Sequence, residues 1–212
     1  MSAHIQISVI NLAARQRMLS QRMVLQTVLA AQGDTNQLEA ARQTFELFCD
    51  SQSRLRLTSE RLDAPSAQRL HDTYDGDGGV AATIDAFIRT VDATLQCIAH
   101  QSPQLLAFLD TVVASVDPVL DALNTATSTF ESISQGKTDL VFQELSGIVS
   151  DIQSVAREAK VVSFSAQVIA ARAGHKGRDF AVVADVLSDI TTEIDGLSKK
   201  AVELAARNRK AA

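Results

Sequence analysis

Two stretches in the last third of the chain carry apolar residues at alternating spacings of three and four, and no other feature of the sequence constrains the fold more. They are Val141, Leu145, Ile148, Ile152, Val155, Ala159, Val162, Ala166 and Ile169, and then Val183, Leu187, Ile190, Ile194, Leu197, Ala201 and Leu204. Side chains at this spacing fall on one stripe of an α-helix, which is the pattern of a coiled coil. We therefore expect each stretch to form one long amphipathic helix.

The stretches are joined by AGHKGRDF, residues 173–180. Gly174 and Gly177 allow a tight reversal there, because glycine adopts backbone conformations that other residues avoid. The sequence thus predicts an antiparallel coiled-coil hairpin over residues 137–212. One arm covers only half of the apolar face of the other, so we also expect at least a homodimer.

The first 134 residues predict a bundle of four helices. Apolar periodicity, caps and prolines place these helices at about residues 3–31, 35–64, 80–99 and 103–134, with a kink in the last at Pro118. Apolar residues make up 46% of the chain and aromatic residues only 4%, which favours helices packed through small aliphatic side chains. We therefore expect an all-α protein with two domains, a four-helix bundle over residues 1–134 and the hairpin over 137–212.

Several classes of function are disfavoured by the sequence. A net charge of -5 gives no basic field for nucleic acid. The acidic stretch DTYDGDGG, residues 72–79, lacks calcium-loop spacing and has Ala86 where the closing glutamate would stand, so we expect a flexible loop. We expect no metal site, no cofactor, no catalytic residues and no enzymatic activity. Neither a signal peptide nor a membrane span is expected, and the two cysteines favour a reducing, cytoplasmic location.

The expected first helix contains the unusual stretch NLAARQRMLSQRM, residues 11–23. The expected heptad seam of this helix runs through Ile7, Ile10, Ala14, Arg17, Gln21, Val24, Val28 and Ala31. It predicts that Arg17 points inward. A buried guanidinium needs a counter-charge. Two alternatives fit: an anion held between the Arg17 side chains of two copies, or an Arg17 that pairs with a carboxylate of another helix or extends to solvent. The candidate carboxylates are Asp85, Asp92 and Asp110.

Residues 161–190, VVSFSAQVIAARAGHKGRDFAVVADVLSDI, resemble the signalling tip of bacterial methyl-accepting chemoreceptors. In that family the hairpin dimerises into a four-helix bundle, and its tip contacts other receptors, a coupling protein and a histidine kinase. The resemblance implies that Arg172 serves receptor contacts, and that Arg178 and Val182 face the coupling protein. The chain departs from the family at Ser165, Ile169, His175 and Asp179. We therefore expect weak binding of the coupling protein.

The stretch INLAARQRMLSQRM, residues 10–23, resembles the opening helix of sensor modules in type IV pilus chemoreceptors and in nitrate- and nitrite-sensing histidine kinases. Those modules are four-helix bundles that bind small oxyanions at a dimer interface. The resemblance implies that Arg17 binds the anion, with Ser20 and Arg22 as its neighbours. Gln21, the next seam position after Arg17, completes the candidate site.

Together these features predict a chemoreceptor-like signal transducer that senses a small, nitrate-like anion at a helix–helix dimer interface and relays it to the coiled-coil tip. The alternative is a ligand-free, degenerate receptor fragment that joins or competes within a chemoreceptor and kinase assembly. A plain helical hairpin without partners is the simplest interpretation of residues 137–212.

Overall fold

A computed structural model describes residues 8–211 of the chain, and every regular element within this range is helical. The expected all-α fold is confirmed. Contacts divide the chain into two compact units, residues 1–133 and 134–212. The start of the expected first helix, residues 3–7, lies outside the described residues. Between residues 8 and 211, no helix combines the length and the apolar character needed to cross a lipid bilayer.

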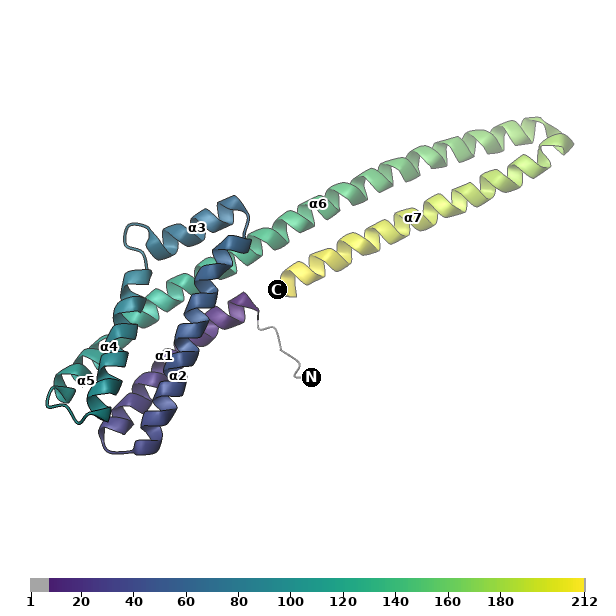
Figure 1. The fold of residues 1–212 in the computed structure, drawn as a ribbon. Helices are drawn as coiled ribbons and strands as arrows, with labels where there is room; N and C mark the ends of the chain where they lie inside the picture. Colours follow the sequence, from purple (N-terminus) through teal and green to yellow (C-terminus); the bar gives the residue numbers. More distant parts are fainter. Residues whose placement is uncertain (1–7, 212) are drawn as a thin grey trace. The chain divides into compact units, whose positions relative to one another are not determined.

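The first unit is a bundle of helices joined by short connections (Figure 1). In chain order they are α1 (Val9–Ala31), α2 (Thr35–Arg56), the 3-10 helix η1 (Leu57–Arg61), α3 (Ala64–Asp75), α4 (Ala81–Ala99), α5 (Leu105–Ala114) and the beginning of α6 (Val116–Arg172). Gly33, with φ of 105°, ends α1, and Asp34 caps α2 by accepting hydrogen bonds from the N–H groups of Asn36 and Gln37. This short turn brings α1 and α2 side by side over most of their length.

Two prolines stand in the first turn of a helix instead of bending one. Pro65 is the second residue of α3, which begins at Ala64 after the cap residue Asp63 and was not expected from the sequence. Pro118 lies in the first turn of α6, and the interruption between α5 and α6 falls at Ser115. The expected kinked helix over residues 103–134 is therefore wrong, because proline lacks an N–H and fits best in a first turn, where none is needed.

The expected loop over residues 72–79 is also shorter than predicted. Helix α3 continues to Asp75, and the connection to α4 contains three glycines. A Cβ at Gly76 would collide with the carbonyl oxygen of Asp72, so the turn needs glycine for its close approach to the end of α3. The acidic stretch is thus mostly a helix end.

A single apolar core holds the first unit together. At its centre the ring of Phe48 on α2 meets that of Phe87 on α4 edge-on, with centroids 5.9 Å apart. Around this pair lie fully buried side chains from four helices: Met23, Leu55, Ile84, Val91 and Leu123. This packing fixes which face of each helix points inward, and therefore which residues of α1 remain accessible.

The second unit is a helical hairpin. The later part of α6, the 3-10 turn η2 (Gly174–Gly177) and α7 (Arg178–Ala211) form two antiparallel arms (Figure 1). Gly136, at the border of the two expected domains, lies within α6. The arms meet through small buried residues seven positions apart, which are Val149, Ala156, Ser163 and Ala170 on α6 and Ala184, Thr191 and Ser198 on α7. Between them, the hydroxyl of Ser163 donates a 2.6 Å hydrogen bond to the carbonyl oxygen of Ala184.

The large apolar residues of the hairpin are not buried between its own arms. Most of the two series that predicted the coiled coil are exposed, including Ile148 (57%), Val155 (65%) and Ile190 (47%). Small side chains bring the arms close together, and the larger ones flank this line of contact. The spacing therefore predicted the helices correctly but assigned the wrong residues to the contact between the arms.

Candidate functional site

Helix α1 buries one face and leaves another open. Its buried face contains Leu12, Gln16, Leu19, Met23 and Ala30, which pack against the rest of the bundle. The expected seam from Ile10 to Ala31 is half-buried or exposed at every position. Val24 packs against the core, whereas Arg17 and Gln21 are exposed. The inward orientation predicted for Arg17 is therefore wrong within one chain, and its side chain lies where a second molecule can reach it.

Arg17 lies on this open face and is exposed. Its Nη1 donates a 2.9 Å hydrogen bond to Oδ1 of Asn124 on α6. Asn124 carries no charge, so the guanidinium is oriented without being neutralised. The alternative partner Asp85 is held by Arg56, whose Nη2 lies 2.6 Å from Oδ1 of that carboxylate. Arg17 thus has no carboxylate partner among the described residues.

The other residues proposed for the anion site do not all share this face. Gln21 lies one turn after Arg17 and is exposed, and Arg22 is exposed as well. Ser20 is 1% exposed, and its hydroxyl donates to the carbonyl oxygen of Arg17 across 2.9 Å. The structure therefore brings Arg17 and Gln21 together and turns Ser20 towards the core.

The polar residues buried next to α1 are amides. Gln16 is fully buried and accepts a 3.3 Å hydrogen bond from Nε2 of Gln52 on α2. Nε2 of Gln16 and Oε1 of Gln52 have no partner among the described atoms. Gln16 was not expected at a buried position, because the predicted seam placed its neighbour Arg17 inward. The spacing did indicate a buried position, since Gln16 stands four residues after Leu12 and seven before Met23, on the same face of the helix.

A second polar cluster joins α2, α3 and α4. Beside the ion pair of Arg56 and Asp85, the guanidinium carbon of Arg56 lies 5.8 Å from the ring centroid of Tyr74. Tyr74 is 3% exposed and packs edge-on against Phe130 of α6. Burial raises the pKa of the Tyr74 hydroxyl to about 12, and the opposing effect of Arg56 is smaller. The cluster ties α3 to α6 close to the end of the first unit.

The exposed apolar residues of the hairpin surround a surface hollow of about 380 Å³. Its walls come from both arms and are formed largely by Ile148, Ile152, Val155, Leu187, Ile190 and Ile194. An apolar face of this kind is unusual on a lone coiled-coil hairpin and is typical of a surface that another molecule covers.

The chain reverses at the far end of the hairpin, over Gly174–Gly177. Gly174 has φ of 58°, and a Cβ at Gly177 would collide with the carbonyl oxygen of Ala170. Arg172, Arg178 and Val182, the residues expected to bind partners, are all exposed around this turn. We call residues 167–182 the tip.

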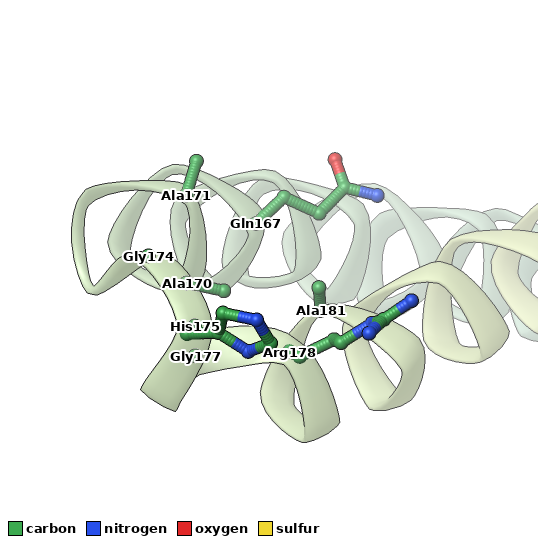
Figure 2. A pocket seen from close by; sticks show the side chains of 8 residues that line it. All are labelled: Gln167, Ala170, Ala171, Gly174, His175, Gly177, Arg178 and Ala181. Atoms are coloured by element: carbon green, nitrogen blue, oxygen red, sulfur yellow. The ribbon is translucent and has the colours of Figure 1, made fainter.

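A hollow of about 340 Å³ lies at the tip. Figure 2 shows the imidazole of His175 and the guanidinium of Arg178 on one side of it, and the amide of Gln167 on the side of α6. Gln167 also donates a 2.6 Å hydrogen bond to Asp185 of α7, which helps to hold the arms in register.

Residues 7–96 match a family model described as the N-terminal region of the type IV pili methyl-accepting chemotaxis transducer. The biofilm dispersion protein BdlA of Pseudomonas aeruginosa is 28% identical over 63% of this chain and 35% of its own length. The methyl-accepting chemotaxis protein TlpQ of the same organism is 29% identical over 40% of this chain and 11% of its own length. No solved structure matches.

The chain is related to the chemoreceptor signalling proteins. The expected resemblance to this family is thereby confirmed. The matched region of the transducer family includes α1 with Arg17 and Gln21, and ends within α4. The chain spans about a third or less of each of these two relatives.

Proposed function

We propose that the chain is a signal transducer that binds a small oxyanion, nitrate or nitrite, between the α1 helices of two copies. Arg17 binds the anion, Gln21 and Arg22 contribute nearby donors, and Ser20 acts indirectly by bonding the backbone of Arg17. The observation that carries the proposal is the exposed guanidinium of Arg17, which an uncharged amide orients. The match to the chemotaxis transducer region supports it.

The anion would serve a physical purpose in the dimer. Two facing guanidinium groups repel each other by about 1–4 kcal/mol at roughly 4 Å, depending on the effective dielectric. A monoanion between them removes this repulsion, and the planar guanidinium suits oxyanions through paired hydrogen bonds. Ligand binding would therefore tighten contact between the two α1 helices.

The hairpin supports the same assembly. Its exposed apolar face, including Ile152 and Ile190, would be covered by the hairpin of the second copy, giving a homodimer with four helices. The same helix, α6, contributes to the sensor unit and to the hairpin. We propose that a small shift of its first turns relays the bound state towards the tip. There Arg172, Arg178 and Val182 would meet other receptors, a coupling protein or a histidine kinase.

Calorimetric titration with nitrate and nitrite tests the sensor role, using wild type, Arg17→Ala and, as a matched control, Arg15→Ala on the same helix. Wild type and Arg15→Ala should bind, and Arg17→Ala should lose at least about tenfold in affinity. Removing the exposed Arg17 should change the free energy of unfolding by less than about 1 kcal/mol. Absence of binding to wild type would contradict the sensor role.

The second candidate is a ligand-free interaction protein, a degenerate receptor fragment that joins or competes within a receptor and kinase assembly. The exposed apolar face of the hairpin favours it, since that face requires a partner whether or not an anion binds. This candidate predicts that wild type does not bind nitrate or nitrite, while its hairpin still associates with a partner.

A further inference from the structure

The tip is positively charged on a chain that is otherwise acidic. It carries Arg172, Lys176 and Arg178, with the imidazole of His175 beside them. The tip contains one carboxylate, that of Asp179. The whole chain has a net charge of -5, so the sign of the charge reverses at this end of the hairpin.

The side chains of these residues have no partners within the part of the chain that the structure describes. Arg172, His175, Lys176 and Arg178 are all exposed, and none forms a hydrogen bond or ion pair with a described residue. Other cations of the hairpin do interact with acids. Lys199, for example, lies 2.8 Å from Asp195. The positive electrostatic potential of the tip is therefore not cancelled by ion pairs with its own side chains.

Arg178 also opposes local stability. It occupies the first position of α7, where the N-terminal end of the helix dipole is positive and favours acidic residues. Together with His175 it lines the hollow of about 340 Å³, opposite the amide of Gln167 (Figure 2). A carboxylate that entered this hollow would meet the guanidinium of Arg178, the imidazole of His175 and the N-terminus of α7. The amide of Gln167 on the other side already donates to Asp185.

We propose that the tip docks onto an acidic surface of a partner protein, and that one carboxylate of this surface enters the hollow between His175, Arg178 and Gln167. The inference rests on the proposed role of the tip as a docking surface and adds the charge of the partner.

The experiment uses the full chain and four probes: purified chemotaxis coupling protein, a short poly-L-glutamate peptide, duplex DNA and anionic lipid vesicles. Wild type is compared with the double variant Lys176→Glu, Arg178→Glu and with the control Lys200→Glu, which reverses a single charge at an exposed residue of α7 outside the tip. Affinities are measured by fluorescence anisotropy from about 0.05 to 0.5 M salt. Circular dichroism checks that helix content is unchanged.

Binding of poly-L-glutamate that falls with salt, falls about tenfold or more in the double variant and is unchanged in Lys200→Glu supports the inference. Coupling protein that binds wild type and the double variant equally, at all salt concentrations, overturns it and leaves the docking role intact. If the coupling protein fails to bind while poly-L-glutamate binds as expected, the preference of the tip for an acidic surface is supported. The coupling protein is then not the partner that carries this surface. Equal, tip-dependent binding of duplex DNA or anionic vesicles overturns the inference, because the tip would then bind any polyanion.

Discussion

Arg17 of α1 and Asn124 of α6 are joined by a 2.9 Å hydrogen bond from Nη1 to Oδ1. The two residues are 107 positions apart in the chain, and both are exposed. An amide at this position orients the guanidinium and leaves its charge available. A carboxylate there would neutralise the charge, so the identity of residue 124 decides whether Arg17 can attract an anion.

Asn124→Asp should therefore weaken nitrate binding at least about tenfold, because the new carboxylate competes for the same guanidinium. As a solvent-exposed ion pair it should raise the free energy of unfolding by no more than about 1 kcal/mol. Asn124→Ala is the matched control, which removes the hydrogen bond and keeps the charge, and it should retain most of the affinity. Calorimetry decides, and nitrate affinity unaffected by Asn124→Asp would show that Arg17 does not bind the anion.

Tyr74 makes stability depend on pH in the alkaline range. Its pKa is about 12 in the folded protein and about 10 when unfolded, so the unfolded chain loses the proton first as pH rises. The contribution of the protonated Tyr74 hydroxyl to the free energy of unfolding is fully present below pH 10, and it is lost as pH rises towards 12. We expect wild type to lose about 2–3 kcal/mol more than Tyr74→Phe over this interval.

This titration can be observed directly, because the chain has one tyrosine and no tryptophan. The near-ultraviolet absorbance of tyrosinate should appear only near pH 12 in the folded protein. Denaturant unfolding of wild type and Tyr74→Phe at about pH 9 and 12 then gives the difference in stability. A tyrosinate signal with a midpoint near pH 10 in the folded protein would contradict the burial of the hydroxyl.

The turn of the hairpin permits a matched comparison of glycines. Gly177→Ala should destabilise the hairpin, because the new Cβ would collide with the carbonyl oxygen of Ala170 and the chain must shift. Gly196→Ala on α7 places its Cβ in open space and should stabilise the helix by about 0.5–1 kcal/mol. Thermal unfolding monitored by circular dichroism should move in opposite directions for the two variants. A shift in the same direction would mean that the turn can relax around a side chain.

The all-helical class could be predicted from the sequence, but several helix boundaries and the inward faces of the helices could not. In α1, apolar residues lie on two stripes, one through Leu12 and Leu19 and one through Ile10 and Val24. Periodicity alone cannot choose between them. Contact with α2 selects the stripe that contains Gln16, which moves Arg17 to the surface. The same ambiguity in the hairpin led to large residues being assigned to a contact that small residues make.

The candidate site was only partly visible in the sequence. The importance of Arg17 followed from family resemblance and from its awkward place in a helix, but its partner Asn124 had no signal, because the contact depends on how α6 packs beside α1. The ion pair of Arg56 and Asp85 was hidden for the same reason. By contrast, the turn residues Gly174 and Gly177 could be read directly, since backbone geometry there requires glycine.

The hairpin should associate with a second copy through its exposed apolar face, and Ile190→Glu tests this. Ile190 is 47% exposed in one chain and lines the apolar hollow, so a charge there should disturb the monomer little. In a dimer the charge would be buried without a partner, which should weaken association by about 2 kcal/mol or more. Thr192→Glu adds the same charge two residues away, outside the hollow, and should leave association unchanged. Sedimentation equilibrium measures the association of both variants and of wild type. A wild-type chain that remains monomeric at micromolar concentration would contradict the dimer proposal, because Arg17 would then have no facing copy.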